Sequence, residues 1–163
     1  DPKAGTAPRM TVAENLLLAK RRGQKRRLKL RGLNNALPEF SELTKKLPNG
    51  LSERINTFTG DLSGGQRQTL SFLMATMGNP EILLLDEHTA ALDPKTSQQL
   101  MELTQNTIEE KQLTCIMITH HLKDALKYGN RMIILNDGKI VLDKSGKEKD
   151  NLTEDEVLKF FTN

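Results

Sequence analysis

The stretch of residues 62–93 constrains this chain more than any other, because it joins a helix start to an apolar strand and two acids. Ser63 and Gln66 have the spacing of a capping box, in which each side chain accepts a hydrogen bond from the other residue's backbone N–H. The two glycines between them leave the start of the helix uncovered. Because the first N–H groups of a helix can bind an anion, the sequence predicts a helix after Ser63 whose N-terminus can receive a phosphate.

This predicted helix has one apolar face and a defined end. Its apolar residues recur at the i, i+3, i+4 and i+7 spacing of a helix that packs on a core. They are Leu70, Leu73, Met74 and Met77. Gly78 is predicted to supply the residue after the last turn, and Pro80 prevents the helix from continuing.

A short apolar strand is predicted next, and it ends in two acids. Residues 82–85 are uniformly apolar and too few for a helix, which is typical of a parallel strand covered on both faces. Asp86 and Glu87 follow directly. Because ligands bind at the carboxyl ends of strands in open α/β sheets, one acid could hold a metal ion while the other handles a water molecule.

These motifs resemble those of the ATP-binding cassette (ABC) ATPases. The family's signature loop reads Leu-Ser-Gly-Gly-Gln, as residues 62–66 do, and its Walker B strand ends in Asp-Glu. Residues 91–93 match the Ala-Leu-Asp D-loop, and Thr119 with His120 matches a later Thr-His pair. The resemblance covers essentially the whole chain. It implies an α/β fold: a partial P-loop NTPase (RecA-like) core with parallel strands, plus an α-helical subdomain.

The resemblance also implies a role for each matched residue. Glu87 would be the general base and His120 the switch histidine that contacts the γ-phosphate, which makes these two the catalytic residues. Asp86 would bind Mg²⁺. His121 competes with His120, and an acidic pair after a strand can alternatively be a helix N-cap. The residues that would contact ATP are Ser63, Gly64, Gly65, Gln66 and Asp93.

The sequence also departs from the family pattern. His88 replaces the usual proline after the acids, and Ala90 replaces a serine that can form a hydrogen bond across the cassette dimer. A G-x-x-x-x-G-K-[ST] P-loop is absent, because neither Gly138-Lys139 nor Gly146-Lys147 has the required neighbours. We therefore expect the C-terminal portion of a cassette, without the Walker A loop and the Q-loop glutamine. Such a portion is not expected to hydrolyse ATP alone.

The pattern of helices and strands predicts two parts. Residues 1–61 carry helix signals and no strand candidate, which resembles the family's α-helical subdomain, and residues 62–163 would be the C-terminal half of the ATPase core. In the first part, a capping box begins a helix at Thr11, and Pro38 is predicted at the first turn of a second helix. Phe40, Leu43 and Leu47 should share one face of that second helix. A short helical turn is predicted after it, at residues 52–55.

After Asp93, helices and strands alternate. Asp93 is a predicted N-cap with Pro94 at the first helical position. Residues 114–119 form a second buried strand that brings His120 to the same sheet edge as the two acids if the strands are parallel. The remaining predictions are a helix over 94–111, a helix over 122–128, a hairpin of 131–135 with 139–142, and a last helix from Thr153 whose Val157, Phe160 and Phe161 face the core.

Composition limits which kinds of membrane segment, disulfide and charged binding surface this chain can have. The apolar runs are far shorter than the roughly 20 residues that cross a bilayer. Cys115 is the single cysteine, so an intramolecular disulfide is excluded, and we expect it to be a small buried side chain. Residues 20–31 hold eight basic side chains and no acid, which leaves 16 basic against 21 acidic groups elsewhere. That run could contact nucleic acid or an anionic leaflet, but a solvated face is favoured.

Two functions follow from the resemblance. The first is the nucleotide-binding subunit of an ABC transporter, which couples ATP binding and hydrolysis at a cassette dimer interface to solute transport, with import favoured. It implies ATP and Mg²⁺ as cofactors, and as partners a second ATPase subunit, transmembrane permease subunits and a solute-binding protein, without nucleic acid. Its place would be the cytoplasm, peripheral on the inner face of the cell membrane. The alternative is a soluble ABC ATPase acting on nucleic acid or ribosomes, which the basic run favours.

Overall fold

A computed structural model describes all residues except 1–4, 26–31, 48, 91 and 162–163. Four members of the basic run (Arg26, Arg27, Lys29 and Arg31), Pro48 and the first residue of the D-loop motif lie outside this described part. The chain forms two compact units, residues 1–116 and 117–163, and each is described by itself. The division expected at residue 61 remains a prediction.

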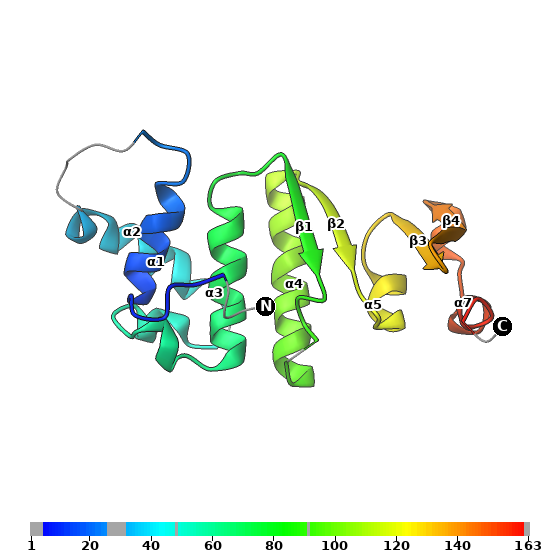
Figure 1. The fold of residues 1–163 in the computed structure, drawn as a ribbon, viewed down its shortest axis with the longest axis horizontal. Coiled ribbons are helices and arrows are strands. Elements are labelled where there is room, and N and C mark those ends of the chain that lie inside the picture. Colours follow the sequence, from blue (N-terminus) through cyan, green and yellow to red (C-terminus); the bar gives the residue numbers. More distant parts are fainter. Residues whose placement is uncertain (1–4, 26–31, 48, 91, 162–163) are drawn as a thin grey trace. The chain divides into compact units, whose positions relative to one another are not determined.

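The first unit is mainly helical (Figure 1). Its elements are α1 (Val12–Lys20), α2 (Leu33–Lys45), the 3₁₀ turns η1 (Leu51–Arg54) and η2 (Thr59–Asp61), α3 (Gly64–Thr76), β1 (Ile82–Asp86) and α4 (Pro94–Lys111). β2 (Thr114–Ile118) begins in this unit and pairs with β1 in a two-stranded parallel sheet. Helices α3 and α4 lie side by side, with β1 following α3 in the chain.

Helix α1 begins as the sequence predicts. The Thr11 hydroxyl accepts a hydrogen bond from the Glu14 N–H at 3.2 Å, and the Glu14 carboxylate accepts one from the Thr11 N–H at 2.9 Å. The side chain of Asn15 is fully buried and holds the preceding segment, since it accepts from the Ala7 N–H at 2.8 Å and donates to the Met10 carbonyl at 3.2 Å. The buried core around α1 comprises Val12, Ala13, Leu16, Leu17, Ala19, Ala36, Phe40, Leu51, Leu62, Leu70 and Met74.

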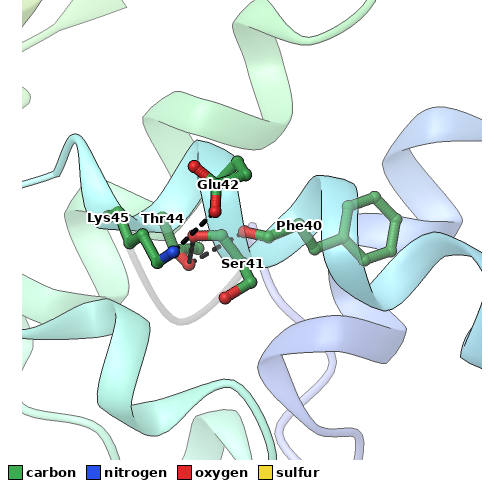
Figure 2. A network of polar contacts seen from close by, with 5 residues as sticks. All are labelled: Phe40, Ser41, Glu42, Thr44 and Lys45. Carbon is green, nitrogen blue, oxygen red and sulfur yellow. Dashed lines mark hydrogen bonds and ion pairs between the residues drawn. The ribbon is translucent and has the colours of Figure 1, made fainter.

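The prediction for the start of α2 is wrong. The helix begins at Leu33, after Gly32 in a left-handed conformation, so Pro38 lies inside the helix and not in its first turn. Phe40 is nevertheless fully buried, as expected. Figure 2 shows the last turns, where the Thr44 hydroxyl donates to the Phe40 carbonyl at 2.8 Å and an exposed Lys45–Glu42 ion pair spans one turn.

The end of α3 also differs from the prediction. Met77 is the C-cap, and the residue with left-handed backbone is Asn79, with φ 45°, not Gly78. The Lys111 ammonium donates to the Thr76 carbonyl at 2.8 Å and to the Asn79 side-chain oxygen at 3.1 Å. A cation at this position satisfies carbonyls that a helix end leaves without partners, and it ties the end of α4 to the end of α3.

Strand β1 is covered on one face, contrary to the prediction of two. Leu83 and Leu85 are buried, whereas Ile82 is 48% and Leu84 is 68% exposed. The same alternation follows β2, where Ile116 is 54% exposed and Cys115 is half-buried, with burial raising the pKa of its thiol. The sequence pattern indicates the apolar character of both faces, but the described part of the chain covers one.

The second unit holds a hairpin and three short helices. Its elements are α5 (Leu122–Lys127), β3 (Arg131–Asn136), β4 (Lys139–Ser145), α6 (Lys147–Asp150) and α7 (Glu154–Leu158). The strands pair antiparallel, and the turn between them has Asp137 and Gly138 at positive φ, as the hairpin signal predicts. The capping box of Thr153 with Glu156 is confirmed.

The small core of this unit joins the hairpin to α7. Met132, Ile134, Leu142 and Val157 are buried, and Phe160 packs against them. Phe161, expected in the core, is 59% exposed, because α7 ends at Leu158 and the following turn directs only Phe160 inward. Helix α6 was not foreseen. In the described part of the chain, no helix is both long and apolar enough to cross a membrane.

Candidate functional site

The turn before α3 has the capping geometry that the sequence predicts. The Ser63 hydroxyl accepts from the Gln66 N–H at 3.2 Å, and the Gln66 side-chain oxygen accepts from the Ser63 N–H at 3.1 Å. The Gln66 amide also donates to the Asn49 carbonyl at 3.0 Å, which fixes it toward the loop after α2. Ser63 and Gly64 are exposed and Gln66 is half-buried, so the helix N-terminus faces solvent with its first turn ordered.

Its two glycines differ in their surroundings. A Cβ at Gly64 would meet no atom within 4 Å, whereas a Cβ at Gly65 would lie 2.6 Å from the Cγ2 of Thr96 in α4. Gly64 is therefore open to a ligand. Gly65 instead allows the close approach of α3 and α4, because no side chain fits between its backbone and Thr96.

Arg67 organises the segment that enters this turn. Its guanidinium donates to the carbonyls of Thr59, Gly60 and Leu62 at 3.1, 3.0 and 3.1 Å. Because the planar guanidinium has five donors in a fixed geometry, one side chain can hold three successive parts of the loop. Arg67 was not among the predicted site residues, since nothing in the local pattern indicates which carbonyls it reaches.

The acidic pair lies at the end of β1, as predicted. Asp86 is the last residue of the strand, Glu87 has left-handed backbone with φ 45°, and both side chains are exposed. Two turns follow, in which the Ala90 N–H donates to the Glu87 carbonyl at 3.0 Å and the Leu92 N–H donates to the Thr89 carbonyl at 3.1 Å. The acids are not the N-cap of the next helix, which removes the structural alternative considered for them.

That N-cap is Asp93. Its carboxylate accepts a hydrogen bond from the Thr96 N–H at 3.1 Å, and Pro94 occupies the first helical position. Hydrogen bonds from Thr96 hold the pKa of the Asp93 carboxyl below its ordinary value. The predicted capping role is therefore confirmed, while contact of Asp93 with ATP remains a prediction.

His88 lies between the exposed acids and α4. Its side chain is buried, with 8% exposed, and its Nε2 is 3.3 Å from the Thr104 hydroxyl of α4. Thr89 is also buried. His88 thus holds the loop against α4, while Asp86 and Glu87 are exposed.

The two histidines after β2 belong to the second unit. Both are exposed, and their ring centroids are 4.4 Å apart. His121 is the N-cap residue of α5, and its N–H donates to the Thr119 hydroxyl at 3.0 Å. This agrees with the prediction that His121 begins the short helix. The role of His120 as the switch histidine remains a prediction.

A Mg²⁺ ion fits the acids at the end of β1. Three or more metal-binding side chains do not gather anywhere in the described residues. However, Mg²⁺ is ordinarily held by one or two carboxylates together with phosphate oxygens and water. Asp86, exposed at the strand end with Glu87 beside it, supplies this kind of donor. We therefore keep Asp86 as the predicted ligand of a Mg²⁺ ion that arrives with a phosphate.

The first unit thus brings together most of the predicted site residues. The signature turn is connected to α4 through the contact of Gly65 with Thr96, and the acids are connected to Asp93 by the short loop 87–93. His120 lies in the other unit. The residues that sequence reasoning missed, Arg67 and Thr104, act through contacts with parts of the chain outside their own motif.

Comparison with known proteins identifies relatives of this chain. The family described as ABC transporter matches residues 3–90. The tyrosine transport ATP-binding protein of Clostridioides difficile (strain R20291) is 47% identical over 161 residues, which are 99% of this chain and 64% of that protein. The methionine import ATP-binding protein MetN of Lacticaseibacillus paracasei is 40% identical over 92 residues, 56% of this chain and 26% of that protein.

Solved structures give the same result. The cassette MJ0796, described as a dimeric bacterial ABC transporter cassette, is 28% identical with a TM-score of 0.66, and the match covers 86% of this chain and 58% of that chain. The same cassette is described in a state bound to ADP and Pi. This chain therefore spans less than two thirds of the length of these relatives. The α/β fold of the P-loop NTPase type is confirmed, and the chain belongs to the ABC transporter family.

Proposed function

We propose that this chain is part of the nucleotide-binding subunit of an ABC transporter and contributes the signature turn, the Walker B acids and the switch histidine. ATP binding and hydrolysis at the interface of two cassettes would drive solute transport. The names of the relatives, tyrosine transport and methionine import, favour uptake over export. They also favour transport over the alternative of a nucleic-acid-dependent ATPase.

One observation carries the proposal. A solvent-facing helix N-terminus, ordered by Ser63 and Gln66, lies in the same compact unit as the exposed acids Asp86 and Glu87. Such a terminus binds a phosphate through backbone N–H groups, and the acids can orient a metal ion and a water molecule. The packing of α3 on α4 explains Gly65 but not Gly64, whose exposed position leaves the backbone open.

In a cassette dimer, the signature turn and the acids Asp86 and Glu87 would act on different ATP molecules. In a cassette dimer, the signature turn would close over the ATP that the partner holds, where Ser63, Gly64, Gly65 and Gln66 offer donors to the γ-phosphate. Glu87 would accept a proton from the attacking water, while Asp86 keeps its carboxylate for Mg²⁺. His120 would donate a hydrogen bond to the γ-phosphate. The 163 residues alone, which contain no P-loop motif, would bind ATP weakly and not hydrolyse it.

The partners follow from the same reasoning. A second cassette supplies the other half of each site, as the dimeric form of MJ0796 suggests. Transmembrane permease subunits would carry the solute, with a solute-binding protein delivering it. The subunit would then lie in the cytoplasm, peripheral on the inner face of the membrane.

Substitution of the predicted base tests this function. In a complete cassette that contains these residues together with a Walker A loop, Glu87→Gln should keep Mg-ATP binding and lower turnover by about 10²- to 10⁴-fold, because the amide keeps the shape but cannot accept the proton. The matched control is Glu81→Gln, an exposed acid just before the other end of β1. Turnover and nucleotide affinity should be measured for both. A Glu87→Gln cassette that turns over ATP like the Glu81→Gln control would exclude Glu87 as the base.

A further inference from the structure

The backbone of Glu87 is held in a conformation that needs support from its neighbours. Its φ of 45° is left-handed, which is uncommon for a residue with a side chain and unfavourable by itself. The residue itself is exposed. The next residue, His88, is buried. The position of Glu87 must therefore depend strongly on how His88 is anchored.

The anchor of His88 is the Thr104 hydroxyl, and the direction of the hydrogen bond can be derived. Thr104 Oγ1 lies 2.8 Å from the Leu100 carbonyl, which can only accept a hydrogen bond, so the single hydroxyl proton points there. Toward His88 Nε2, at 3.3 Å, the same oxygen must then accept. The imidazole therefore carries its proton on Nε2.

This anchor is attached to a well-formed part of the molecule. Thr104 is buried in the middle of α4, an 18-residue helix capped by Asp93, and the loop from Glu87 enters that same helix. Because the Ala90 N–H also bonds the Glu87 carbonyl, the peptide on the C-terminal side of Glu87 is fixed from two directions. A shift of His88 would therefore turn the Glu87 side chain.

We propose that His88 is a positioning residue that places Glu87 for proton abstraction through an Nε2–H hydrogen bond to Thr104. The proposal rests on the proposed function of Glu87 as the base. His88 touches neither ATP nor water in this role. It acts through the backbone of Glu87 and replaces, by a side-chain hydrogen bond, the rigidity that a proline would give the same position.

The test changes Thr104 and leaves His88 in place. Thr104→Val keeps the shape and removes the acceptor, and Thr104→Ser restores it. The matched control is Thr107→Val on the same helix, because the Thr107 hydroxyl makes the same type of bond, to the Leu103 carbonyl at 2.8 Å. In the complete cassette, Thr104→Val should lower kcat about three- to tenfold with KM for ATP unchanged, since one hydrogen bond is lost. Thr104→Ser and Thr107→Val should keep wild-type kcat.

Two further measurements separate this inference from the proposed function. Thr104→Val added to Glu87→Gln should cause no additional loss of kcat if Thr104 acts through Glu87. In ¹⁵N-histidine spectra of the 163-residue chain, His88 should carry its proton on Nε2, and Thr104→Val should change that signal whereas Thr107→Val should not. Equal kcat values for Thr104→Val and Thr107→Val, or a proton on Nδ1 alone, would overturn the inference even if Glu87→Gln is inactive. If instead Glu87→Gln is fully active, the proposed function fails whatever the His88 spectrum shows.

Discussion

The helices α1–α3 and the strand β1 belong to the same compact unit but bury their apolar residues to very different degrees. Leu16, Phe40 and Leu70 are fully buried among the helices, whereas Leu84 in β1 is 68% exposed. A helix has one apolar stripe and can bury it against two neighbours, but a parallel strand has two apolar faces and needs a layer on each. Among the described residues, the helices therefore bury their apolar faces, whereas the strand that carries the acids is covered on one face.

Stability should follow this difference, which gives the largest expected effect. Phe40→Ala removes a fully buried ring from the helical core and should lower the free energy of unfolding by about 3–5 kcal/mol. Leu84→Ala removes an exposed side chain and should change it by no more than about 0.5 kcal/mol. Urea denaturation of the 163-residue chain measures both. Similar losses for the two variants would show that the outer face of β1 is covered after all.

The ATPase rate, unlike the stability, should depend on the residues that follow the strands β1 and β2. Strand alternation does not separate His120 from His121, because β2 ends at Ile118 and the two rings lie 4.4 Å apart. His121 is the N-cap residue of α5, so we predict that His120 is the one that contacts the nucleotide. A charge-assisted hydrogen bond contributes about 1.5–3 kcal/mol, so His120→Ala should lower the ATPase rate of a complete cassette by roughly one to two orders of magnitude. His121→Ala serves as the control and should stay within a few-fold, since His121 begins α5. An inactive His121→Ala with an active His120→Ala would reverse the assignment.

Features that depend on residues close in sequence were predicted well. The capping boxes at Thr11, Ser63 and Thr153 all form, because their hydrogen bonds join residues three positions apart. The two-residue turn at Asp137 and the cap at Asp93 are equally local. For these elements the pattern of residue types is sufficient.

Features that depend on distant parts of the chain were missed or wrong. The cover of β1 could not be inferred, because an apolar run indicates what a strand could bury and not what is there to cover it. Pro38 was placed at a helix start on propensity alone, whereas the packing of Leu33 and Leu37 against the core extends α2 toward its N-terminus. Likewise, the bonds of Arg67 to three carbonyls and of His88 to Thr104 depend on the folded arrangement. The chemical roles at the site came from the family resemblance and remain to be tested.

The third prediction concerns the contact between Gly65 in α3 and Thr96 in α4 and its effect on the stability of the fold. Gly65→Ala would place a methyl group 2.6 Å from Thr96 Cγ2, and the branched threonine side chain cannot rotate away freely. We expect a loss of about 1–3 kcal/mol in the free energy of unfolding. Gly64→Ala, with no atom within 4 Å, should be neutral or slightly stabilising. Thr96→Ser removes Cγ2 and should restore most of the stability of Gly65→Ala, and failure to do so would place the strain elsewhere.

The smallest effect concerns the charge at the start of α4. The pKa of Asp93 is lowered in the folded chain, so its carboxylate stabilises the fold above the ordinary pKa of 3.8, and this contribution is lost as the pH falls through the lower, folded-state pKa. Asn caps a helix about as well as Asp but lacks the charge that favours a helix N-terminus. At pH 7 the wild-type Tm should therefore be slightly higher than that of Asp93→Asn, and the difference should shrink as the pH is lowered below 3.8. Thermal denaturation of both chains across this range measures the difference. A gap that widens on acidification would mean that the charged form of Asp93 does not stabilise the helix start.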